Sequence, residues 1–380
     1  MVGTIGGDRV APKLEDPLEA AIVQFPEQPK KITFDKLLEQ NLGNFGRYQL
    51  LQFILLCLPT IFVAMHVMSW AFVAVPPPLS CANTTFMMNC TIDDSVHSAV
   101  GRWQMYGDRS WIKATVQSLY YIGQMTGSLF CGIMGDKWEQ LVQTQNSKYQ
   151  SFGMIDLVRT PKMRTRTLIC FFLWPVNTMM YYGLTMKSDL GGGSLYMNFA
   201  VSALMEIPAL LLVYFLIDRI GRRQLVTLGL LTAGICLICN CFIGDDDSGL
   251  FYGLLCYDEK LEVLLNYSIA VPFYWGMLQM MITKGAVTVS YTAMYTYTSE
   301  LFPTVIRNTA VGCCSTIARV GAIISSYMAL WLVDSYGKFA MVIPFTALSL
   351  GAAILTGVFL PETMNKPMPE SISEVEGTEI

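Results

Sequence analysis

Long runs of apolar residues alternate with short polar stretches along this chain, and the runs are long enough to cross a membrane. Each run reaches the roughly 20 residues that a helix needs to span a bilayer. Lipid offers no partner to a bare backbone, so spanning segments of this kind fold as helices. We therefore predict an all-α polytopic membrane protein. Its expected spans are approximately 50–75, 112–134, 167–187, 195–217, 224–243, 268–298, 305–333 and 340–360.

The composition supports a membrane protein and gives no sign of an enzyme. Hydrophobic residues make up 53% of the chain and charged residues only 14%, against about 25% charged in ordinary soluble proteins. The two histidines fall in no metal or nucleophile motif, and no glycine loop for phosphate is present. No basic surface interleaved with aromatic residues suggests nucleic acid. We therefore expect no catalytic residue, no cofactor, no metal and no nucleic-acid partner.

The polar loops predict the topology. Basic residues cluster before the first span, after the second and after the fourth, which by the positive-inside rule places these three loops in the cytoplasm. Both termini then lie in the cytoplasm. The loop between the first two spans lies on the opposite side and carries two glycosylation sequons, at Asn83 and Asn89. A multi-pass glycoprotein is expected, located in the plasma membrane if it is correctly trafficked.

Most of the eleven cysteines lie inside apolar runs, where small packing residues are a better interpretation than metal ligands. Cys81 and Cys90 differ, because they occupy the polar loop that holds the sequons. If that loop faces an oxidising compartment, the two can form a disulfide.

Three charged segments lie where predicted helices end on the cytoplasmic side. They read DRIGRR at 218–223, ELFPTVIRN at 300–308 and PETMNKPMPE at 361–370. Carboxylates and guanidinium groups there could form a conformational latch that holds neighbouring helices in one state and releases them in another. The alternative is that these charges only anchor helix ends at the membrane surface. The candidate latch residues are Asp218, Arg222, Arg223, Glu300 and Arg307.

Together with SFGMIDLVRTP at 151–161, YYGL at 181–184 and GNFGRYQ at 43–49, these segments resemble the organic ion (cation, anion and carnitine) transporter family of the major facilitator superfamily. The resemblance implies two six-helix halves around a central site. The chain departs from it after Gly135-Asp136-Lys137, where Trp138-Glu139-Gln140 replaces the family's basic ending. The family's third to sixth helices are missing, which leaves about eight transmembrane helices instead of twelve.

This comparison suggests a division into five parts. The expected parts are a cytoplasmic N-terminal segment (1–46), a truncated N-terminal bundle of two helices (47–137, with an outer loop at 76–111), a cytoplasmic linker (138–166), a six-helix C-terminal bundle (167–362) and a cytoplasmic tail (363–380).

Three ionisable residues lie within predicted spans, where a charge is expensive and usually faces a cavity or a partner. Arg319 could be a fixed positive charge for an anionic or zwitterionic substrate, or a structural partner of Glu206 or another acid. Glu206 and Lys284 are similarly divided between substrate contact and structural pairing. The resemblance implies that arginine at position 319 is typical of anion and carnitine carriers.

Aromatic residues could complete a site for flat organic ions. Trp174 shares a helix face with Tyr181 and Tyr182, and Tyr291 shares one with Tyr295. By resemblance these five line the central cavity, whereas ordinary aromatic packing is the alternative.

The predicted function is therefore transmembrane transport of a small organic ion by alternating access, with an organic anion or a carnitine-like zwitterion favoured. The alternative is a truncated, non-transporting membrane protein that acts as a binding or dominant-negative partner. The lipid bilayer is the surrounding partner in either case, and the sequence leaves the oligomeric state open.

Overall fold

A computed structural model describes most of the chain. The described residues are 46–75, 79–84, 87–92, 98–105, 107–143, 154–188, 195–242, 270–304, 306–366, 368–369 and 372–377. Two compact units are distinguished, residues 1–65 and residues 66–380. In the first unit the description begins at Gly46, so the predicted N-terminal segment 1–46 and the start of its family-like stretch lie almost wholly outside it.

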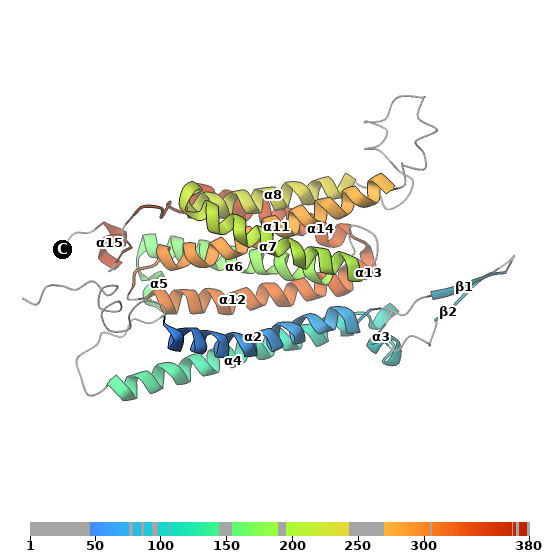
Figure 1. Ribbon diagram of the computed structural model, residues 1–380, viewed down its shortest axis with the longest axis horizontal. Helices are drawn as coiled ribbons and strands as arrows, with labels where there is room; N and C mark the ends of the chain where they lie inside the picture. The colour runs from blue at the N-terminus through green and yellow to red at the C-terminus, as the bar shows by residue number, and fades with distance from the viewer. Residues whose placement is uncertain are drawn as a thin grey trace, which may run out of the picture. The chain divides into compact units, whose positions relative to one another are not determined.

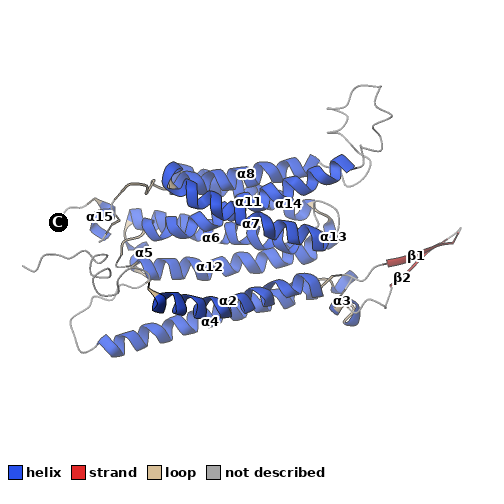
Figure 2. Cartoon of the chain, viewed as in Figure 1, coloured by secondary structure: helices blue, strands red, loops and turns tan. Residues whose placement is uncertain are grey.

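Helices dominate the described residues, and the prediction of an all-α polytopic fold is confirmed (Figures 1 and 2). The long helices are α2 (Arg47–Val73), α4 (Trp111–Gln143), α6 (Pro161–Met186), α7 (Leu195–Ile220), α8 (Arg222–Phe242), α11 (Ala270–Leu301), α12 (Arg307–Tyr327) and α14 (Phe339–Phe359). Short elements connect or flank them: α3 (Ala99–Arg102), η1 (Gly107–Arg109), α5 (Asp156–Arg159), a π-helical turn η4 (Met328–Leu332), α13 (Val333–Tyr336) and α15 (Ile372–Glu376).

Six of these helical segments, searched within the described residues, are long and apolar enough to cross a membrane. The helices α4 and α11 have 33 and 32 residues but are not among the six. Polar residues interrupt both, and those such as Lys113, Gln117, Gln279 and Lys284 are buried inside the bundle. Their lower hydropathy therefore reflects side chains that face the protein interior.

The helices of residues 161–359 pack around α6 and α11. The most extensive contacts join α11 to α8, α12 to α6 and α14 to α8, and α4 packs along α12. Small residues allow the closest crossings. A Cβ added to Gly321 of α12 would lie 2.1 Å from the carbonyl oxygen of Pro175 in α6. Gly221, with φ of +107°, makes the tight turn between α7 and α8.

The loop between α2 and α4 contains a β-hairpin that the sequence pattern did not predict. Strands β1 (Leu79–Thr84) and β2 (Met87–Ile92) pair antiparallel, with Cys81 directly opposite Cys90. The pairing of these cysteines and the glycosylation of Asn83 and Asn89 stay predictions.

Candidate functional site

Aromatic rings of α6 and α11 form a continuous row across the bundle. The ring of Trp174 meets that of Tyr295 with centroids 4.6 Å apart, and Tyr295 meets Tyr291 at 5.4 Å. Tyr291 stacks on Tyr181 at 5.1 Å, and Tyr181 meets Tyr182 edge-on at 5.4 Å. All five aromatic residues selected from the sequence therefore lie in one row.

The rings in this row differ in their exposure. Trp174 is fully buried, and its indole N–H donates to Thr298 Oγ1 at 3.1 Å. Tyr181, Tyr182 and Tyr291 are half-buried, and Tyr295 is 41% exposed. Trp174 thus fits the packing interpretation, whereas the tyrosines present ring surface that an organic ligand can reach.

Helix α4 adds two tyrosines that sequence reasoning missed. The ring of Tyr121 lies 5.2 Å from that of Tyr182, and Tyr120 lies 5.6 Å from Tyr121. The sequence did offer a signal for them, because they are adjacent tyrosines in the second predicted span, like the pair at 181 and 182. The aromatic row therefore extends from the six helices of residues 161–359 onto α4.

Lys284 and Glu206 form a buried ion pair beside Tyr181. Lys284 Nζ lies 3.2 Å from Glu206 Oε1, and Tyr181 Oη donates to the same carboxylate oxygen at 2.9 Å. The ammonium also donates to the Tyr181 carbonyl and to Thr185 Oγ1, and it lies 3.4 Å from the centroid of the Tyr181 ring. These contacts satisfy Lys284 and hold the side chain of Tyr181, which favours the structural interpretation of the pair.

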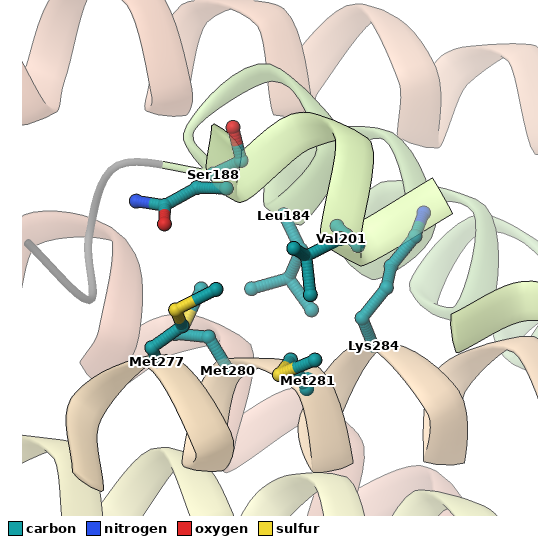
Figure 3. Close-up of a pocket in the computed structure, with 9 residues that line it drawn as sticks. Leu184, Ser188, Val201, Met277, Met280, Met281 and Lys284 are labelled. Carbon is teal, nitrogen blue, oxygen red and sulfur yellow. The ribbon is translucent and has the colours of Figure 1, made fainter. Parts of the chain in front are cut away.

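A small cavity lies beside Lys284, as Figure 3 shows. Met277, Met280 and Met281 line it from α11, across from Leu184 of α6 and Val201 of α7. Its volume is about 20 Å³, which is room for roughly one water molecule. The cavity is therefore too small for an organic ion.

Arg319 does not join the ion pair of Lys284 and Glu206. One guanidinium nitrogen donates to the carbonyl and to the hydroxyl of Ser315, one turn earlier in α12, at 2.6 and 2.5 Å. Its Nε is buried without a hydrogen-bond partner. Tyr120, Tyr182 and Tyr291 all lie within electrostatic range of this cation. Glu206, which the sequence offered as its structural partner, pairs with Lys284 instead.

At the end of the bundle where α8 begins, which we call the Arg222 end, charged residues join four segments. Arg222 pairs with Asp218 at 2.9 Å and with Glu300 at 3.1 Å. Thr363 donates to Glu300 Oε2 at 2.6 Å, and Glu362 Oε1 accepts from the Arg222 backbone N–H at 3.0 Å. The structure thus brings three of the five candidate latch residues together. Glu362 and Thr363 were not selected from the sequence, although they belong to a motif that it singled out.

The guanidinium groups of the other two candidates, Arg223 and Arg307, make different contacts. Arg223 donates to the Leu360 carbonyl at 3.2 Å, and Arg307 approaches the sulfur of Met368 at 3.4 Å. Arg223 also donates its backbone N–H to Glu362 Oε1 at 3.4 Å, but within the described residues no ion pair links either guanidinium group to a carboxylate. Their contacts tie the C-terminal segment to α8 and α12.

Residues 139–374 match the family described as sugar (and other) transporters. The chain belongs to this family. Among its relatives are the organic cation transporter protein of Drosophila melanogaster, 37% identical over 223 residues, and solute carrier family 22 member 2 of Mus musculus, 32% identical over 224 residues. Organic cation/carnitine transporter 2 of Homo sapiens is 30% identical over 238 residues.

These matches confirm the resemblance to organic ion transporters. They cover 59–62% of this chain but only 36–37% of the length of the three relatives. This sugar transporter family member therefore spans well under half the length of the relatives it matches, in keeping with the absence of four helices inferred from the sequence. All three relatives are named as transporters or solute carriers, and none as an enzyme.

At the end of the bundle opposite the Arg222 end, this transporter-family chain has an ion cluster that the sequence did not reveal. Asp334 of α13 pairs with Lys113 of α4 at 2.5 Å and with Lys187, which follows α6, at 3.0 Å. The side chain of Lys113 is only 6% exposed. The indole of Trp70 donates to the Lys113 carbonyl, and Thr115 bonds to Tyr327. We call this the Asp334 cluster, which joins α4 to the helices of residues 161–359.

Replacing Asp334 by asparagine is expected to destabilise the protein, because it leaves the buried ammonium of Lys113 without its counter-charge. Removing one partner of a buried pair costs roughly 3–5 kcal/mol, and the partial exposure of Asp334 reduces the expected loss to about 1–3 kcal/mol. Thermal unfolding of the purified protein in detergent measures the effect. Asp218→Asn is the matched control, because its carboxylate is 75% exposed and should contribute under about 1 kcal/mol. Equal melting temperatures for the two variants would contradict this account.

Proposed function

We propose that this chain binds small organic ions in a membrane and moves them by alternating access, with organic anions or carnitine-like zwitterions as the favoured substrates. The observation that carries this proposal is the state of Arg319. Its guanidinium is half-buried, its Nε has no partner, and none of the described carboxylates pairs with it. A desolvated cation with spare donors is suited to a substrate carboxylate, which it can bind in a bidentate manner.

Tyrosines supply the second half of such a site. Tyr120, Tyr182 and Tyr291 interact electrostatically with the Arg319 cation, and Tyr295 packs against Tyr291 in the same row. Aromatic faces attract quaternary ammonium groups and stack on flat rings. A ligand with a carboxylate on Arg319 and a cationic or aromatic part on the tyrosines would use both features. Lys284 and Glu206 support the site indirectly by orienting Tyr181.

The two charged ends of the bundle suit the conformational part of the proposal. In the proposed orientation, the Arg222 end faces the cytoplasm with both termini, and the Asp334 cluster faces outward with the loop of Asn83 and Asn89. Ion pairs that close one end and break when it opens are a common basis for switching between two states. We propose that the Asp334 cluster closes the outer end. A plasma-membrane location and the five-part division of the chain belong to the same proposal.

A second candidate function is a non-transporting binding or dominant-negative partner. The observation that favours it is the exposure of α7, which is 11% buried across its most apolar stretch, whereas α6 is 67% buried. Gly123 and Gly127 of α4 also face open space in the structure. These surfaces would normally pack against a full second half. Such a chain could hold a ligand at Arg319 without moving it.

Ligand binding tests the shared part of both candidates. A carnitine-like zwitterion or an aromatic carboxylate, present at about 100 times its dissociation constant, should stabilise the purified protein by ~2.7 kcal/mol. Arg319→Gln should abolish this stabilisation, because it removes the charge that receives the carboxylate. The control variant is Arg164→Gln, which changes an exposed arginine near the start of α6, far along that helix from Tyr182. It should leave the stabilisation by the ligand unchanged. Stabilisation that survives Arg319→Gln would refute the proposed role of Arg319.

A further inference from the structure

A long apolar groove runs between α7 and α8, with α11 as its floor. It has a volume of about 350 Å³, within the usual range of ligand sites. Helices α7 and α8 each pack on α11 far more than on one another, which leaves the groove between them. Fifteen residues line it, and the only polar side chain among them is that of Thr232. Several of its walls, including Leu212, Leu228 and Ile282, are 43–50% exposed.

The groove has the length of a lipid chain. Its lining on α7 extends from Met205 to Ile220, a rise of about 22 Å at 1.5 Å per residue. One leaflet of the hydrocarbon core is about 15 Å thick. The groove is therefore long enough to hold the whole of one phospholipid acyl chain from that leaflet.

A cation marks one mouth of the groove. Arg219 follows Leu216 by three residues and Leu212 by seven, so it continues the helix face that lines the groove. Its side chain is exposed, and no ion pair is recorded for it among the described residues. The neighbouring Asp218 is paired with Arg222, and Arg222 is also paired with Glu300. Arg219 is therefore the charge at this mouth that can meet an anionic group.

We propose that the groove and Arg219 form a binding site for one anionic phospholipid, with an acyl chain between α7 and α8 and the phosphate on Arg219. Charge complementarity decides the choice of lipid, because the cationic group of a zwitterionic head group offsets the attraction of its phosphate to Arg219, whereas a net anionic head group keeps that attraction. In the proposed orientation this mouth faces the inner leaflet, where anionic lipids are concentrated. The site is separate from Arg319 and its tyrosines. It would link the lipid composition of the membrane to the separation of α7 and α8.

The experiment measures lipid retention by the full-length protein with native mass spectrometry. Detergent-purified protein is exposed to phosphatidylserine and phosphatidylcholine with identical acyl chains. We expect phosphatidylserine to be retained about fivefold more, as one basic residue at an anionic surface provides. Arg219→Gln should remove this preference, and Arg164→Gln, at another exposed arginine, should preserve it. Equal retention of the two lipids by the unaltered protein would overturn the proposal.

Two further variants fill the groove from opposite walls. A side chain at Gly285 would enter open space, so Gly285→Leu should occupy the floor without a clash. Leu212→Trp should narrow the groove from α7. Both should reduce phosphatidylserine retention at least about fivefold, because part of the acyl chain loses its apolar contacts, while the melting temperature stays near that of the unaltered protein. Unchanged retention in both would overturn the proposal. If inorganic phosphate or glycerol phosphate raised the melting temperature of the protein as much as phosphatidylserine does, the site would bind simple anions rather than a lipid. That result would also overturn the proposal. None of these readouts depends on transport, so the outcome is independent of the proposed function.

Discussion

Replacing Lys284 by methionine is expected to lower the free energy of unfolding by about 2–4 kcal/mol, because the 29% exposure of the Glu206 side chain reduces the loss of roughly 3–5 kcal/mol found when one partner of a buried ion pair is removed. The variant leaves the partly buried Glu206 carboxylate without its cation. It also removes the ammonium from beneath the carbonyl and ring of Tyr181. Thermal unfolding in detergent measures the loss.

A double variant separates the pair from the rest of the packing. Lys284→Met combined with Glu206→Gln removes both charges and leaves an amide that can still accept from Tyr181. It should recover most of the lost stability, because an ion pair replaced by neutral groups of similar volume is often neutral in its effect. A double variant less stable than Lys284→Met alone would show that Glu206 does not depend on Lys284.

Replacing Gly321 by alanine is expected to have the second large effect. The added Cβ would lie 2.1 Å from the carbonyl oxygen of Pro175 and 2.8 Å from its Cα, and backbone atoms cannot move aside as a side chain can. Helices α6 and α12 must separate, which should cost at least about 1–3 kcal/mol. The separation would also shift Arg319, two residues earlier in α12, relative to Tyr182. Weaker ligand binding should therefore accompany the lower melting temperature.

Gly312 provides a control on the same helix. A Cβ there meets nothing within 4 Å, so Gly312→Ala should be neutral or stabilising by about 0.5–1 kcal/mol through helix propensity. If the two alanine variants unfold at the same temperature, the close crossing of α6 and α12 is not a determinant of stability.

The sequence predicted the helices well because each forms a long apolar run with a clear polar boundary. It also identified Glu206, Lys284 and Arg319, since a charge inside an apolar run is unusual. It left open which of them pair, because pairing depends on how α6, α7, α11 and α12 are rotated. The structure joins Lys284 to Glu206 and leaves Arg319 to Ser315.

The Asp334 cluster and the hairpin were not predictable on the same grounds. Lys113 and Asp334 lie 221 positions apart, and each is near a helix end, where charges are ordinary. The strands at 79–84 and 87–92 lack a regular alternation of apolar and polar residues. Tyr120 and Tyr121 were visible in the sequence, but only the packing of α4 against α6 and α12 gives them a role.

Uptake by cells that express this chain tests the central claim most directly. Labelled organic anions, carnitine-like zwitterions and organic cations would be offered separately, and surface delivery would be quantified in the same cells. The account predicts saturable uptake of an anion or zwitterion, and its loss in Arg319→Ala at equal surface delivery. No uptake of any of the three classes despite surface delivery would contradict transport by this chain and favour a binding or dominant-negative role.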